Sequence, residues 1–397
     1  MLRTNKLSPT GLLYIFRLLS YSDFTLPMLL FFYASRGLSF SEVMVLKSLG
    51  AITIVLCDIP TSLAADYFGR ARVLLAGVIL RILAMAGLVL VWDKAYYFVF
   101  EIIYAIGFST LSGGAEALIS DCIDSKHIKK TLGNHEFFGL TGLALSTVVG
   151  GVVAQVRIEL PLILNAIIFT IATVPLLVFM SRYGQTQNKT PRKQFNNILA
   201  EYGSLFTHKN LVSYLLFGGM IYFFSKITVW TMQKQMAFIG FDKNLIGIVI
   251  AVTVVLTAIG AKSMARLSRW LGNVGALLIV LLSMLICAWI LAMVTSKYLV
   301  AGYLFFAISR GVYFPLIVSI LLSDYGATAK ATIVSTITVF GNIIFVVLSP
   351  IIGQMVDGSG IYSAQFTIAL FASACVCIFC SYFLKTYTFK EISNGAV

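Results

Sequence analysis

Two ionisable side chains fall inside runs of apolar residues. Asp23 lies in YSDFTLP, residues 21–27, between the apolar stretches GLLYIFRLLS and MLLFFYASRG. Lys226 lies in another apolar run, FSKITVW, residues 224–230, and carries the opposite charge. An ionisable residue inside a bilayer is costly and by default marks a functional site with a partner. The two residues direct attention to the membrane spans that must hold them.

The composition predicts a polytopic membrane protein. Of 397 residues, 59% are hydrophobic and 11% charged, whereas a soluble domain has about 25% charged residues. A hydrocarbon core of ~30 Å needs roughly 20 apolar residues per helix. A membrane β-barrel would instead show alternation over segments of about ten residues. We therefore predict an all-α fold with twelve spans, at 10–33, 43–65, 73–92, 95–119, 135–156, 158–181, 210–232, 242–261, 272–295, 297–322, 330–352 and 361–386.

The placement of the basic residues predicts the topology. Eighteen of the 29 Lys and Arg residues fall in loops on one side of the predicted membrane, six on the other side and five in spans. Cytoplasmic loops carry such an excess, so we expect both termini in the cytoplasm. The net charge of +13 then reflects topology and implies no nucleic-acid partner. Short loops favour a bacterial inner membrane.

The two halves of the chain form an internal repeat. The longest polar stretch, 182–209, predicts a cytoplasmic linker between two six-helix bundles, 1–181 and 210–397. A constant offset of 203 residues aligns landmarks in four helices of each half, which argues for a real repeat. The aligned landmarks are SDFT (22–25) with SKIT (225–228), Gly69 with Gly272, LISD (118–121) with LLSD (321–324), Ser146 with Ser349, and Gly150 with Gly353.

Repeated halves with a midplane site are the architecture of secondary transporters. Asp23 and Lys226 occupy equivalent places in the two halves. Equivalent positions can meet across a pseudo-symmetry axis, so we predict that the two side chains pair at an outer gate. The alternative is that each bonds locally or reaches the outer interface.

The short loop after the second predicted span carries a family motif. Its sequence, ADYFGRAR (65–72), resembles the motif G-x-x-x-D-x-x-G-R-R/K of the major facilitator superfamily. Ser62 replaces the leading glycine. The resemblance implies a twelve-helix transporter whose cytoplasmic gate is latched by Asp66, Gly69, Arg70 and Arg72, with Asp121 as a partner. In the second half Arg269 takes the place of Asp66, so we expect a weaker latch there.

The fifth predicted span carries GLALSTVVGG (142–151). It resembles the antiporter motif of the same superfamily, with Ser-Thr in place of Gly-Pro, and the resemblance implies export by antiport. Small residues let helices approach closely. The expected helix-packing residues are Gly142, Gly150, Gly151, Pro350 and Gly353. The arginine-glycine pair of the family's fourth helix is absent, while Arg310-Gly311 occurs in the tenth span.

Charged residues in the spans define a predicted cavity for substrate and protons. Glu101 and Glu116 could share one face of the fourth span. Burial favours the protonated form of a carboxyl group, and small neighbours in SGGAEALISD make Glu116 our candidate proton acceptor. Permanent pairing of Glu116 with Arg81 is the alternative. The full set is Arg17, Asp23, Arg81, Glu101, Glu116, Lys226 and Arg310.

The bases in this set outnumber the acids by one, which favours a carboxylate-bearing or zwitterionic solute, such as a siderophore or organic acid, over a cationic drug. We expect a monomeric exporter of a drug, siderophore or metabolite driven by the proton gradient, without another cofactor or a metal. A proton-coupled importer is the alternative.

Other classes find little support. No Gly-x-Ser-x-Gly, no complete zinc-protease motif and no phosphate-binding Gly-x-x-x-x-Gly-Lys loop occurs, so a membrane-embedded enzyme is disfavoured. No loop on the outer side is long enough for a channel filter. A receptor without transport activity is the remaining alternative.

Overall fold

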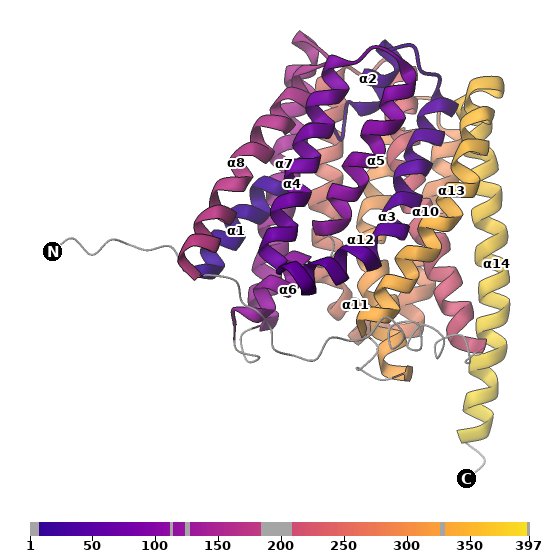
Figure 1. Ribbon diagram of the computed structural model, residues 1–397. Helices are drawn as coiled ribbons and strands as arrows, with labels where there is room; N and C mark the ends of the chain where they lie inside the picture. The colour runs from indigo at the N-terminus through magenta and orange to yellow at the C-terminus, as the bar shows by residue number, and fades with distance from the viewer. Residues whose placement is uncertain (1–7, 112–113, 124–127, 184–208, 326–329, 395–397) are drawn as a thin grey trace. The chain divides into compact units, whose positions relative to one another are not determined.

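The computed structural model describes residues 8–111, 114–123, 128–183, 209–325 and 330–394, and its regular secondary structure in this part is helical (Figure 1). The helices are α1 (Pro9–Tyr21), α2 (Leu29–Ser35), α3 (Phe40–Phe68), α4 (Arg70–Leu90), α5 (Lys94–Leu111), α6 (Gly114–Asp121), α7 (Ile128–Val156), α8 (Leu160–Tyr183), α10 (Lys209–Phe238), α11 (Lys243–Met293), α12 (Leu299–Tyr325), α13 (Lys330–Ser359) and α14 (Ile361–Asn394).

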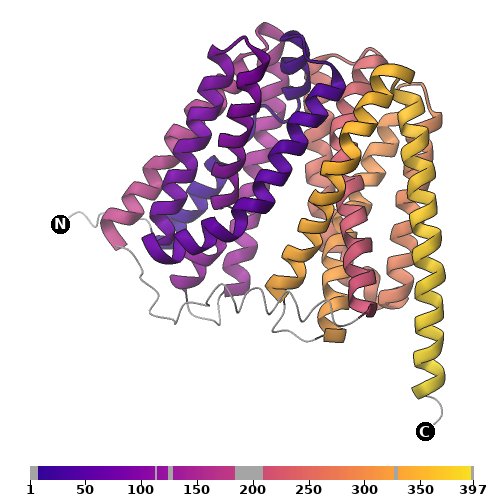
Figure 2. The ribbon, with the colours of Figure 1, turned by 45° about the vertical axis from the view of Figure 1, so that its right-hand side comes forward.

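Ten helical stretches in the described residues are long and apolar enough to cross a membrane. Helix α11 counts once among them although it holds two predicted spans, 242–261 and 272–295, joined across Gly272. The last helix, α14, continues to Asn394, past the predicted end of its span at 386 (Figure 2). The predicted all-helical membrane architecture is confirmed.

The first predicted span, 10–33, is not continuous. Helix α1 ends at Tyr21, Ser22 has an extended backbone with φ −62° and ψ 126°, and α2 begins only at Leu29. Two residues explain the interruption. The Asp23 side chain offers the following amides an alternative acceptor, and Pro27 has no N–H and disfavours helix in the residue before it. The sequence prediction of an unbroken helix was wrong here.

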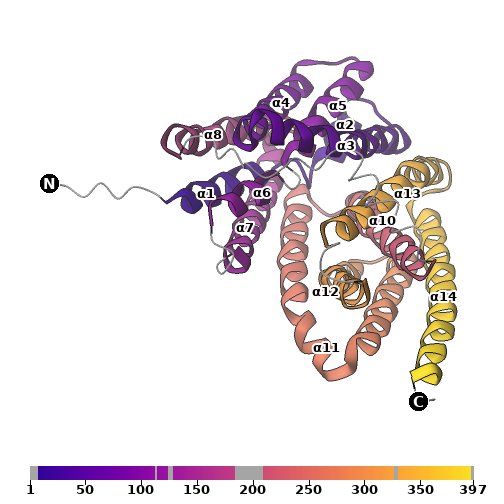
Figure 3. The same ribbon diagram turned by 60° about the horizontal axis from the view of Figure 1, so that its bottom comes forward.

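Glycines with positive φ end the second helix of each half. Gly69 (φ 95°) separates α3 from α4, and Gly272 (φ 70°) breaks α11 into two segments that form a hairpin (Figure 3). Gly37 (φ 78°) and Gly240 (φ 89°) lie in the turns before α3 and α11. Both pairs are separated by the same 203 residues that relate the sequence landmarks. Only glycine adopts these conformations without strain.

Contacts divide the chain into two compact units. Unit 1 comprises residues 1–194, 236–255 and 346–353, and unit 2 comprises 195–235, 256–345 and 354–397. In unit 1, α4 packs against α5 and α8, α3 packs against α5, and α1 packs against α7 and α8. Unit 2 has its own apolar core, built from α10, the second segment of α11, α12, α13 and α14. The predicted linker, 182–209, falls almost entirely outside the described residues.

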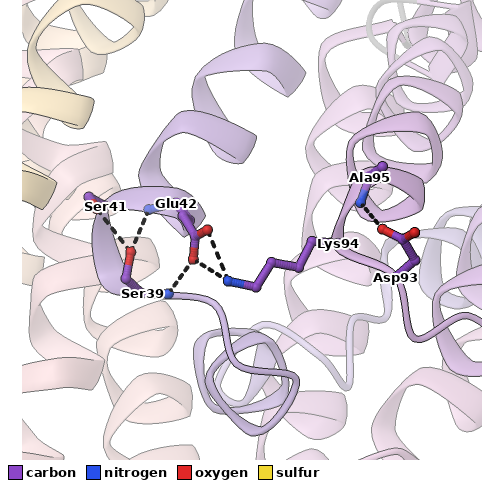
Figure 4. A network of polar contacts seen from close by, with 6 residues as sticks. All are labelled: Ser39, Ser41, Glu42, Asp93, Lys94 and Ala95. Carbon is purple, nitrogen blue, oxygen red and sulfur yellow. Dashed lines mark hydrogen bonds and ion pairs between the residues drawn. The ribbon is translucent and has the colours of Figure 1, made fainter.

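Side chains at the start of α3 tie together two turns of unit 1 (Figure 4). The Ser39 hydroxyl accepts from the Glu42 amide at 3.2 Å, and the Glu42 carboxylate accepts from the Ser39 amide at 2.8 Å. This reciprocal capping box satisfies two amides at the helix start. Lys94 Nζ, at the start of α5, lies 3.0 Å from both Glu42 carboxylate oxygens.

We expect Gly272→Ala to lower the free energy of unfolding by about 1–3 kcal/mol, because φ 70° and ψ 167° place the residue in a region that is open only to glycine. Gly358→Ala is the matched control, since Gly358 has helical backbone and nothing within 4 Å of an added Cβ. Denaturant-induced unfolding in detergent micelles measures both. Equal stability of the two variants would contradict the expectation.

Candidate functional site

The interruption of the first span is organised by Asp23. Its Oδ1 accepts hydrogen bonds from the Thr25 amide at 2.9 Å, the Thr25 hydroxyl at 2.6 Å and the Leu26 amide at 3.1 Å. Asn165 Nδ2 on α8 donates a fourth, at 2.9 Å. Asp23 therefore acts as a capping group for the turn that leads into α2.

Two further side chains complete the backbone hydrogen bonding of this segment. The Asp23 amide donates to Ser146 Oγ on α7 at 2.7 Å, and the Phe24 amide donates to Asn165 Oδ1 at 2.8 Å. Ser146 and Asn165 are fully buried. An exposed amide inside a membrane must find such partners. The segment 22–28 is thus an irregular stretch in which α7 and α8 hold the first two amides and the segment's own Asp23 holds the next two.

Helix α7 approaches this segment through glycine. A Cβ on Gly142 would collide with the Leu18 carbonyl oxygen, and one on Gly150 would collide with the Phe24 carbonyl oxygen. Ser146 stands between them, one helical turn from each. The motif residues of the fifth predicted span therefore form the surface that receives the interrupted helix.

Arg81 on α4 lies at the other side of the interruption. Its guanidinium donates to the Ser20 carbonyl oxygen at 2.7 Å and to the Tyr104 hydroxyl at 3.1 Å, and it lies 3.9 Å from the centre of the Phe169 ring. The residue is 3% exposed. A cation at the C-terminal end of α1 is stabilised by the helix dipole. The described residues place no carboxylate within ion-pair distance of Arg81.

Arg17 on α1 holds two carboxylates. Its Nη2 lies 2.8 Å from Glu136 on α7 and 3.6 Å from Glu116 on α6, and its guanidinium lies 4.1 Å from the centre of the Tyr21 ring. Glu116 meets Arg17 here and has no ion pair with Arg81, the partner in the alternative reading of the sequence. Glu136 is not among the predicted site residues. Its position beside His135 in HEFFG, at the start of the fifth predicted span, is the feature of the sequence that could have indicated it.

Glu101 on α5 has a different partner. Its carboxylate lies 2.7 Å from Lys47 Nζ on α3 and 3.5 Å from the Tyr33 hydroxyl on α2. The Lys47 and Glu101 side chains are 10% and 8% exposed. Glu101 and Glu116 therefore serve separate clusters of unit 1. Lys47 is not among the predicted site residues. Lys47 and Glu101 lie equally far from the starts of their helices, in the second to third turn, and this shared position could have indicated the pair.

In unit 2, Lys226 Nζ on α10 donates to Asn342 Oδ1 on α13 at 2.8 Å and lies 4.4 Å from the centre of the Phe345 ring. Arg310 on α12 donates to Thr257 Oγ1 on α11 at 3.2 Å. The partners that Asp23 and Lys226 find within their own units stabilise each charge. Their mutual pairing stays a prediction.

The loop motif after α3 forms a compact ion-pair network. Arg70 lies 2.6 Å from Asp121 at the end of α6 and 3.7 Å from Asp66, and it donates to the Ala117 carbonyl oxygen at 2.7 Å. Gly69 supplies the positive φ that separates the two helices. Beyond the span, burial raises the pKa of the Cys122 thiol, so the thiol stays neutral beside this network. Arg72, the last basic residue of the motif, is exposed on the first turn of α4.

Small residues also join helices at the other end of α3 within unit 1. Ser48 and Ser349 are 2.7 Å apart through their hydroxyls, and a Cβ on Gly353 would lie 2.7 Å from the Ser41 Cα. On α7 and α11, a Cβ on Gly247 would lie 2.9 Å from the Gly151 Cα. Pro350 lies inside α13 between these contacts. Backbones are in direct contact at this end.

The family model described as Major Facilitator Superfamily matches residues 12–349. The chain belongs to the Major Facilitator Superfamily. A search of curated proteins finds no match. The described residues hold no group of three or more His, Cys, Asp or Glu side chains that could bind a metal.

Solved structures share the fold of the superfamily. The nucleoside transporter NupG has a TM-score of 0.81 at 12% identity, with 95% of this chain and 99% of that chain covered. A bacterial homologue of the human lysosomal transporter Spinster, in an inward-facing and unoccupied conformation, has a TM-score of 0.75 at 16% identity, with 96% and 97% covered. A D-xylose–proton symporter has 0.67 at 14%, with 91% and 96% covered. Identities this low show a shared fold.

The hydrogen bonds of Asp23 predict different results for two substitutions. Asp23→Asn keeps an acceptor oxygen, so we expect the free energy of unfolding to stay within about 1 kcal/mol of the native value. Asp23→Ala leaves amides of the interrupted segment without their acceptor and should cost at least about 2 kcal/mol. Unfolding in detergent micelles measures both. Equal losses for the two variants would show that charge, and not the acceptor, is needed for folding.

Proposed function

We propose that this superfamily member is a proton-coupled secondary transporter that exports a small organic solute by alternating access. The observation that carries the proposal is the interrupted first span, surrounded by the buried charges of unit 1. Irregular backbone at membrane depth is tolerated where it is buried in protein or lines a water-filled cavity, and discontinuous helices form substrate sites in transporters. We propose a monomer in a bacterial inner membrane with both termini in the cytoplasm.

The distribution of charge favours a solute that carries a carboxylate. Arg81 and Arg310 hydrogen-bond to neutral groups, whereas the acids Glu101 and Glu116 each face a basic side chain. An intramembrane cation calls for a counter-charge. A bound carboxylate would supply it, and this favours an organic acid, a siderophore or a zwitterion over a cationic drug. The fold itself serves different solutes, since the related structures include a nucleoside transporter and a sugar symporter.

Proton coupling is assigned to the cluster of Arg17, Glu116 and Glu136. Two carboxylates on one guanidinium leave one negative charge in excess, and uptake of one proton neutralises it. The Glu116 and Glu136 side chains are 40% and 50% exposed, so neither carboxylate is enclosed by the protein. The buried pair of Lys47 and Glu101 is already neutral overall and serves this role less well. Arg17 lies on α1, directly before the interruption, so a change in its ion pairs acts on that segment.

Export is supported by the resemblance of 142–151 to the antiporter motif and by the close contact of Gly142 and Gly150 with the interrupted helix. A proton-coupled importer of the same class of solute is the second candidate, because a D-xylose–proton symporter shares the fold. One assay separates the two. Purified protein in liposomes is tested for counterflow of organic acids, siderophores and cationic drugs, and then for solute flux under an imposed pH gradient. Solute moving opposite to the proton gradient supports export, and solute moving with it supports import; absence of counterflow for every class overturns transport.

For coupling, we expect Glu116→Gln to reduce proton-driven accumulation at least tenfold while counterflow without a pH gradient stays within twofold. The variant removes the group that takes up the proton but leaves Glu136 to hold Arg17. Glu42→Gln is the matched control, since Glu42 is 41% exposed and also faces a base, Lys94. Coupled transport unchanged by Glu116→Gln would refute the assignment.

We also propose that the contact between α3 and α13 at Ser41 and Gly353 acts as a gate on the outer side. Gly353→Leu should keep this contact open, because the added side chain would collide with the Ser41 backbone. With a Ser48→Cys reporter in a background without native cysteines, labelling by an impermeant maleimide added outside should rise at least threefold. Gly358→Leu, on the same helix with nothing within 4 Å, is the control. Unchanged labelling would mean that this contact does not close the gate.

A further inference from the structure

A cavity lies inside unit 2, between α10, the second segment of α11, α12 and α14. Its volume is about 40 Å³. By the same measure of volume, a cavity needs roughly 10–15 Å³ to hold one water molecule. Most of its wall is apolar, and Met220, Phe224, Met284, Ala288, Ala372 and Cys375 are among the lining residues. None of the lining residues is charged. The cavity therefore has no group that would hold an ionic solute.

The polar side chains on the wall are already engaged. Thr228 Oγ1 donates to the Phe224 carbonyl oxygen at 2.6 Å, and Gln365 Nε2 donates to Gln235 Oε1 at 3.3 Å. A buried water needs two to four polar partners, and cavities without them stay dry. The cavity is thus suited to hydrocarbon and poorly suited to water.

The equivalent positions in unit 1 carry two larger side chains that stack on each other. At the offset of 203 residues, Met284 corresponds to Arg81 and Ala372 corresponds to Phe169. In unit 1 the Phe169 ring and the Arg81 guanidinium stack at 3.9 Å, and both residues are buried. In unit 2 a methyl group stands where the ring would be, and a flexible thioether stands where the guanidinium would be. Met284 and Ala372 both line the cavity, so it lies where unit 2 has the smaller side chains.

The helices around the cavity also face the bilayer. On the second segment of α11, Ile286 is 59% exposed, and on α14 Leu370 and Ile378 are 48% and 69% exposed. The wall residues Ala288 and Cys375 on the same two helices are only half-buried, so the cavity lies directly behind a lipid-facing surface. Methionine adapts its shape to such irregular space. We propose that the cavity takes the terminal carbons of an acyl chain from a neighbouring membrane lipid.

Photo-crosslinking in liposomes tests the proposal. The probe is a phosphatidylcholine with a diazirine at the end of one acyl chain, and adducts are mapped by mass spectrometry. We expect adducts on buried Met284 as well as on exposed Ile286. Ala372→Phe replaces the missing ring and should reduce the Met284 adduct at least fivefold while the Ile286 adduct stays constant. Ala374→Phe, an exposed position on the same helix, is the matched control and should change neither adduct.

Three results would overturn the proposal: adducts confined to exposed residues, a Met284 adduct that persists in Ala372→Phe, or labelling of Met284 by a soluble alkyl diazirine and not by the lipid probe. Ala288→Leu fills the same cavity from α11 and replaces Ala372→Phe if that variant does not fold. Because the cavity carries no charge and belongs to unit 2, its occupancy is independent of proton-coupled transport, so either proposal can fail without the other.

Discussion

A helix that is interrupted within a membrane must find partners for the amides that the interruption exposes, and much of unit 1 follows from this constraint. Asp23 and Asn165 accept from the amides of the interrupted segment, Ser146 accepts one more, and Arg81 meets a carbonyl at the end of α1. No water is available in a hydrocarbon core to replace these groups. The charged residues that are costly to place inside a membrane span are therefore part of the structure that makes the interruption possible.

The same constraint explains why α7 approaches the interrupted segment closely. Ser146 of α7 reaches the interrupted segment because α7 presents glycine to it at positions 142 and 150. A larger residue at either position would separate the backbones and draw Ser146 away from the amide that it satisfies. Close packing and hydrogen bonding are thus coupled here, and the small-residue motif serves the polar network as much as it serves packing.

The two halves of the chain share the positions of their glycine turns but differ in their charged residues. Positive-φ glycines recur at one offset, whereas Arg17, Arg81 and Glu101 correspond to Met220, Met284 and Leu304. Removing one member of a buried charge network leaves its partners uncompensated at a cost of several kcal/mol, roughly 3–5, so such networks are gained or lost together. Unit 1 consequently holds the ionisable clusters, and unit 2 holds an apolar cavity at the place of Arg81 and Phe169.

The sequence alone determined the helical membrane architecture, the repeat with its offset and the glycine turns, because hydropathy and backbone conformation are local properties of a chain. It also identified most of the residues that carry charge into the membrane. Only the tertiary structure decided their partners: Glu116 lies with Arg17, Glu101 lies with Lys47, and Asp23 caps an interrupted helix. Partnership depends on how helices that are distant in the sequence rotate and pack against one another. That is a property of the folded chain, and residue type and spacing alone do not determine it.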